Sequence, residues 1–180
     1  MDSNTESFDQ YESVDNGKEQ LEGVRDILTR IMYDKALALS EFTSGRKITT
    51  EHVKSSFSFM IPKSTLYENA RTHAETKVKE AFETTTMERV DMRKPKVELS
   101  PRARMSDAAT LYMDSLVSYI IDLIVSLAPS QTPHGYSLAV QGNSTLADMF
   151  EVNKISFLSN TVSPYLSFGL YRKSKMDGTE

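Results

Sequence analysis

The chain has 180 residues, a formal net charge of −4, 39% hydrophobic residues and no cysteine. This length and apolar content suffice for one domain, or two small ones, with a buried core. The absence of cysteine excludes disulfides, a thiolate nucleophile and cysteine-ligated zinc sites. The three histidines, His52, His73 and His134, match no metal-binding spacing, so we expect neither a metal site nor a cofactor.

The charges are unevenly distributed along the chain. Residues 1–23 contain seven acidic groups and one lysine, a balance of −6, whereas the other 157 residues carry 20 basic and 18 acidic groups, a balance of +2. Residues 89–104 contain six basic residues and two acidic residues. The N-terminus is acidic and polar where a secretory signal needs a basic end and an apolar stretch, so we expect an intracellular protein.

The first half of the chain predicts three helices. Apolar residues recur at helical spacing between residues 17 and 43, at Val24, Ile27, Leu28, Ile31 and Met32. The segment SGRKITT follows, and its β-branched residues Ile48, Thr49 and Thr50 favour a short extended step. A shorter helix is expected from Glu51, capped by Thr50, to the break at Pro62, and another from Ser64 to about Phe82.

The second half repeats this plan. Ser106 or Asp107 is expected to cap a long apolar helix that ends at Ala128, and the loop PSQTPHG, a short helix YSLAVQ, a turn and a helix STLADMF follow. The long helix has the length of a membrane span, but Asp114 and Asp122 within it favour a buried core helix, so no membrane contact is expected. Residues 84–98, polar and charged, are the expected linker between the halves.

The two halves resemble histones 2B and 2A. The run DILTRIMYDKALALSEFTSGRKITTEHVKSSFSFMIP is similar to the end of the central helix, the second loop and the third helix of histone 2B, and LYENARTHAETKVKEAF to its C-terminal helix. RMSDAATLYMDSLVSYIIDLIVSLA resembles the first loop and central helix of histone 2A, and PHGYSLAVQGNSTLADMF its third helix and the short helix beyond. The fused order, with shortened ends, resembles a small, "mini" form of the histone doublets of giant viruses of the marseillevirus group.

The resemblance implies an all-α fold in which two histone folds within one chain form an intramolecular handshake. The implied parts are an acidic arm (1–16), a 2B-like fold with its C-terminal helix (17–83), a basic linker (84–98), a 2A-like fold (99–150) and a docking segment with a tail (151–180). The implied function is a core histone doublet that packages viral DNA in nucleosome-like particles, in the virion and in the viral factory or host nucleus. The implied partners are double-stranded DNA and a tetramer or doublet of 3-like and 4-like histones, with no small-molecule substrate.

The resemblance also implies two sets of site residues. In the handshake, the second loop of one partner is expected antiparallel beside the first loop of the other, with backbone amides and cations facing DNA phosphates. The residues expected to contact DNA are Lys18, Arg46, Lys47, Thr49, Thr50, Arg102, Arg104 and His134. The residues expected to dock on the histone tetramer, because this segment has too much apolar surface for a free tail, are Val152, Ile155, Phe157, Leu158, Val162, Tyr165 and Leu166.

Departures from the family leave an alternative open. The positions of the acidic patch of histone 2A read Ser118, Leu123, Ser126, Asn143, Ser144 and Thr145, so the patch is absent, and the loop PSQTPHG has lost its cations. A histone-fold module that caps or regulates other histones with little DNA contact is therefore the alternative. No nucleophile, base and oxyanion donor gather in the pattern, so no enzyme is expected.

The remaining polar and apolar residues have ordinary structural interpretations. A Gly-Arg-Lys loop without a family resemblance is most often a solvated turn. His52 and His73 are expected on solvated helix faces. Four methionines at helical spacing are expected in the core, namely Met32, Met60, Met113 and Met149.

Overall fold

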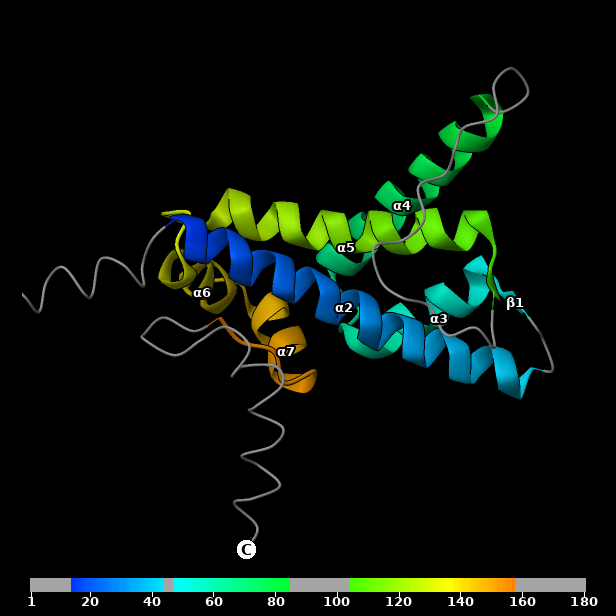
Figure 1. Ribbon diagram of the computed structural model, residues 1–180, viewed down its shortest axis with the longest axis horizontal. Coiled ribbons are helices and arrows are strands. Elements are labelled where there is room, and N and C mark those ends of the chain that lie inside the picture. Colours follow the sequence, from blue (N-terminus) through cyan, green and yellow to red (C-terminus); the bar gives the residue numbers. More distant parts are fainter. Residues whose placement is uncertain (1–13, 44–46, 85–103, 158–180) are drawn as a thin grey trace, which may run out of the picture. The chain divides into compact units, whose positions relative to one another are not determined.

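The computed structural model describes residues 14–43, 47–84 and 104–157. Within these ranges 82% of the residues are helical, in six helices, and the only strands are one pair of two-residue strands (Figure 1). The protein is therefore all-α, as the sequence predicts.

The described part of the first half contains α2 (Val14–Phe42), β1 (Lys47–Ile48), α3 (Thr50–Met60) and α4 (Thr65–Thr84). The N-cap of α3 is Thr49, whose backbone is extended at φ −100° and ψ 169°, and not Thr50, which is already helical. The expected cap was therefore one residue too late. Ile61 is extended because the residue before a proline is kept out of the helical region, and α3 ends there.

The second half contains β2 (Arg104–Met105), α5 (Asp107–Leu127), α6 (Pro133–Gln141) and α7 (Ser144–Val152). Ser106 caps α5, since its Oγ accepts the backbone N–H of Ala109 at 3.1 Å. The helix α6 begins three residues earlier than predicted. Pro133 suits the first helical position, where its missing N–H does no harm, and Thr132 Oγ1 accepts the N–H of Gly135 at 3.1 Å.

The apolar helix α5 is a core helix. Six of its residues are fully buried, Ala109, Tyr112, Met113, Leu116, Ile120 and Ile124. By length and composition alone α5 could cross a membrane, and half of its most apolar stretch is buried within the protein. The four methionines expected in the core are at most 1% exposed, which confirms that prediction.

The chain divides into two compact units, Met1–Val24 with Asp122–Glu180, and Arg25–Ile121. Neither unit corresponds to one half of the sequence. In the first, a Cβ on Gly17 would lie 2.5 Å from the carbonyl oxygen of Gln131. In the second, Arg25 Nη1 donates to Ser118 Oγ at 3.2 Å. Each unit is therefore built from segments of both halves.

The chain reverses direction sharply after α7. Lys154 has a positive φ of 56°. The N–H of Ile155 donates to the carbonyl oxygen of Phe150 at 2.8 Å, and the N–H of Lys154 donates to the carbonyl oxygen of Glu151 at 3.1 Å. These two bonds are those of a Schellman motif, which satisfies the last carbonyls of a helix and brings the following apolar residue back onto it. Ile155 and Phe157, which follow α7, therefore pack against residues of the same unit.

Candidate nucleic-acid interface

The strands β1 and β2 pair in parallel, with Lys47 opposite Arg104 and Ile48 opposite Met105. The N–H of Ser106 extends the pairing by donating to the carbonyl of Ile48 at 3.0 Å. The loop before α3 therefore lies beside the loop before α5, but the expected antiparallel direction is wrong.

The helices that follow the strands explain the parallel direction. β1 leads into α3 and β2 leads into α5, and the Lys54 ammonium of α3 lies 5.7 Å from the centre of the Tyr112 ring of α5. Lys54 and Tyr112 stand six and seven residues beyond the ends of their strands. Two helices that meet at nearly equal distances beyond the ends of paired strands indicate that those strands run the same way.

The strand pair brings basic residues of both halves into register. Lys47 is exposed and makes no ion pair within the described residues, whereas Ile48 is fully buried and anchors the strand. Both helix starts lie at the same end of the pair, and helix N-termini favour anions. Two carboxylates oppose this effect, because Glu51 and Asp107 occupy the first turns of α3 and α5. The local charge is thus mixed.

The other residues expected to contact DNA are distributed as follows. Thr49 is exposed and Thr50 partly exposed, both beside β1, while Arg46 and Arg102 lie outside the described residues. Lys18 and His134 are exposed in the first unit, where the turn of α2 before Lys18 contacts the loop before α6. The structure thus places Lys18 and His134 in the first unit, and pairs the backbones of Lys47 and Arg104 in the second.

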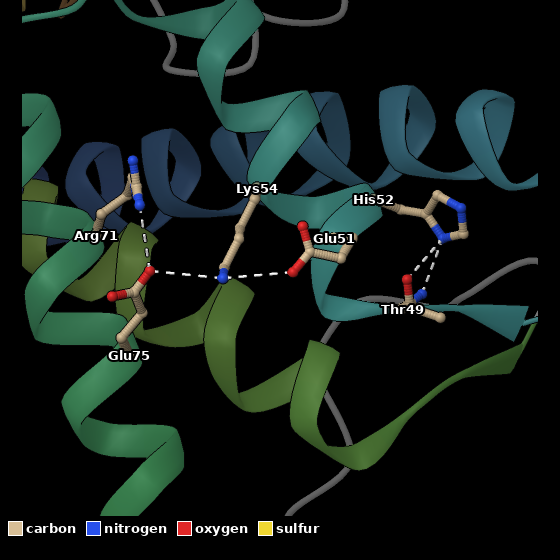
Figure 2. Close-up of polar contacts among 6 residues, drawn as sticks. All are labelled: Thr49, Glu51, His52, Lys54, Arg71 and Glu75. Carbon is tan, nitrogen blue, oxygen red and sulfur yellow. Dashed lines mark hydrogen bonds and ion pairs between the residues drawn. The ribbon is translucent and has the colours of Figure 1, made fainter.

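An ion-pair network beside the strands was not expected from the sequence (Figure 2). The Lys54 ammonium lies 3.4 Å from Glu51 Oε1 and 3.5 Å from Glu75 Oε1, and Arg71 Nη2 lies 3.4 Å from the same Glu75 oxygen. The pairs within one helix have the spacing of three or four residues that suggests contact. The contact of Lys54 with Glu75, which joins α3 to α4, has no such spacing and could not be predicted from the sequence.

A buried hydroxyl group lies under this network. Tyr112 is fully buried, and its Oη has no hydrogen-bond partner within the described residues. Burial raises the pKa of the Tyr112 hydroxyl well above its usual range, and the negative charge of Glu75 adds to that rise. Tyr112 therefore remains neutral and acts as the ring beneath the Lys54 ammonium, a cation–π contact.

The two histidines expected on solvated faces both make contacts. The ring of His73 lies 5.5 Å from that of Tyr119, and both are partly buried. His52 Nδ1 lies 3.0 Å from the backbone nitrogen of Thr49, and its Nε2 lies 3.0 Å from Thr43 Oγ1. Both histidines are partly exposed, so they lie on partly solvated faces and in addition make contacts that the sequence did not predict. For His52, its place three residues after the N-cap is the sequence signal of a capping side chain.

The expected docking residues differ in exposure. Val152 is 67% exposed, but Ile155 and Phe157 are only 5% and 7% exposed. The Phe157 ring lies 5.5 Å from that of Tyr136 and 5.8 Å from that of Phe150. The idea that a partner must cover Ile155 and Phe157 is therefore wrong, because their own unit covers them. Leu158, Val162, Tyr165 and Leu166 lie outside the described residues.

Neither models of known protein families nor curated protein sequences match this chain. The functional interpretation consequently depends on the sequence resemblance and on the geometry of the strand pair.

Proposed function

We propose that this chain is a histone doublet, a fused 2B-like and 2A-like handshake pair that binds the duplex DNA backbone without sequence specificity in a nucleosome-like particle. The observation that carries the proposal is the parallel pairing of β1 with β2. It brings the loop before α3 beside the loop before α5, with Lys47 opposite Arg104. Two basic loops from separate halves meeting in this way support one phosphate-binding edge.

Contacts between the halves support the pairing part of the proposal. Gly17 packs on the backbone at Gln131, Arg25 bonds to Ser118, and Lys54 covers Tyr112. Each contact joins a residue of the first half to one of the second. A chain whose halves formed separate domains would have no reason to bury its long helices in this way.

The salt dependence of binding to random duplex DNA tests the proposal. Neutralising Lys47 and Arg104 to alanine should lower the magnitude of the slope of log K against log salt by about 0.9 for each phosphate that these side chains neutralise, with no change in sequence preference. The matched control neutralises Lys63 and Lys77, two exposed lysines away from the strand pair. Equal slopes for the two double variants would place DNA binding elsewhere on the chain.

The alternative function is a module that caps other histones with little DNA contact. Its supporting observation is the pair of carboxylates, Glu51 and Asp107, at the helix starts beside the strand pair, where they repel phosphate. The same titration separates the two functions. Measurable binding of the parent protein at low salt supports the doublet, and no binding at low salt combined with assembly on a histone tetramer supports the cap.

A further inference from the structure

The imidazole of His52 is held at both of its nitrogens. Its Nδ1 lies 3.0 Å from the backbone nitrogen of Thr49 and 3.1 Å from Thr49 Oγ1, the two contacts drawn in Figure 2. Its Nε2 lies 3.0 Å from Oγ1 of Thr43, the residue that follows α2. One side chain of α3 thus connects the N-cap of its own helix to the end of α2.

The donor and the acceptor of each hydrogen bond in this connection can be assigned. The N–H of Thr49 can only donate, so Nδ1 accepts and the neutral ring carries its hydrogen on Nε2. Nε2–H then donates to Thr43 Oγ1, whose hydroxyl lies 3.1 Å from the carbonyl oxygen of Leu39 and 3.2 Å from that of Ser40. The chain of bonds satisfies polar groups at the end of α2 and the start of α3, and each bond polarises the next.

We propose that His52 is a clasp that ties Thr43 to Thr49 and thereby positions Lys47, which lies between them. Fixing both ends of a short segment removes conformations that the chain would otherwise lose on binding. A cation that is already ordered when phosphate arrives binds it with a smaller entropy loss. The positioning part of the inference rests on the proposed function, whereas the clasp itself does not.

Four substitutions separate the clasp from ordinary helix capping. Thr43→Val removes the hydroxyl but leaves the bond from the Thr49 N–H to His52 intact, and His52→Ala removes every hydrogen bond of the imidazole ring. His52→Gln is the conservative variant, because its amide can offer an acceptor and a donor as the imidazole does. Thr76→Val, on the exposed face of α4, is the matched control for the loss of a threonine hydroxyl.

Limited trypsin digestion measures the clasp without DNA, through the rate at which fragments ending at Arg46 or Lys47 form. We expect Thr43→Val to cleave about fivefold faster than the parent, the change that corresponds to one ordinary hydrogen bond. His52→Ala should cleave at least as fast, and the double variant should cleave more slowly than the product of the two single effects, since both substitutions break the hydrogen bond between His52 and Thr43. His52→Gln should cleave more slowly than His52→Ala. Thr76→Val should match the parent.

Two digestion results would overturn the clasp. One is a Thr43→Val variant that cleaves at the rate of the control. The other is a double variant whose rate is the product of the two single effects, because independent effects mean that His52 and Thr43 do not act through one hydrogen bond.

DNA titration then tests whether the clasp positions Lys47 for binding phosphate. Thr43→Val should weaken binding by about two- to fivefold with an unchanged salt slope, since it leaves every phosphate-binding cation in place. Faster digestion with unchanged DNA affinity would overturn the positioning role and leave the clasp. A parent protein that binds no DNA would instead refute the proposed function, and digestion alone would then decide the clasp.

Discussion

Phe157 should contribute strongly to stability if the residues after α7 belong to their own unit. It is 7% exposed, and its ring lies 5.5 Å from that of Tyr136 and 5.8 Å from that of Phe150. Phe157→Ala removes a buried aromatic ring and leaves a cavity, so the free energy of unfolding should fall by about 3–5 kcal/mol. That decrease is a large part of the total stability of an ordinary domain, roughly 5–15 kcal/mol.

Urea unfolding followed by circular dichroism measures this decrease. With a slope of roughly 1–3 kcal/mol per molar urea, the midpoint should fall by at least about 1 M. Val152→Ala is the matched control, because Val152 is an apolar residue of the same segment but is 67% exposed, and its change should stay within about 0.5 kcal/mol. If Phe157→Ala costs no more than this control, Phe157 is not buried in solution and docking on a partner again becomes its best interpretation.

Two backbone predictions can be checked by the same unfolding measurement. Lys154→Gly should stabilise the protein by about 1 kcal/mol, because Lys154 has a φ of 56°, which glycine adopts without strain; an unchanged or lower midpoint would contradict this turn. Gly17→Ala should destabilise despite the better helix propensity of alanine, because its Cβ would meet the Gln131 carbonyl at 2.5 Å. Gly23→Ala, in the same helix, is the control, and the close packing of Gly17 is refuted if both variants gain stability equally.

The long helices were predictable from the sequence because burial sets their apolar spacing. The observed α2, α4 and α5 begin and end within about three residues of the expected positions. Helix starts were less certain where two adjacent residues could both cap, as with Thr49 and Thr50. The backbone conformation determines which residue is the N-cap, and Thr49 is the N-cap of α3 because its backbone is extended.

The direction of the strand pair was not predictable from its own residues. Lys47 and Ile48 favour an extended backbone equally well beside a parallel or an antiparallel partner. The direction follows from the contact of Lys54 with Tyr112, which joins residues 58 positions apart. Contacts at such separation leave no periodic signal in a single sequence.

The return of the chain after α7 was missed for a different reason. Turns with positive φ are usually marked by glycine or asparagine. Here the residue with positive φ is Lys154, so the sequence carries no such mark. Without the turn, the apolar residues after it were interpreted as a surface for a partner, although Ile155 and Phe157 complete the core of their own unit.

The ion-pair network limits which cations can serve a phosphate-binding edge. Lys54 and Arg71 already lie between carboxylates, and both pair with Glu75, so moving them onto phosphate would break these ion pairs. Among the described residues, the proposed edge therefore depends on Lys47 and Arg104. Two neutralised phosphates give a salt slope of about 1.8, so affinity at this edge should fall only about tenfold between 50 and 200 mM salt. Two cations hold DNA weakly, so stable packaging requires further DNA-binding residues, either from the other basic positions of this chain that are expected to contact DNA or from histone partners.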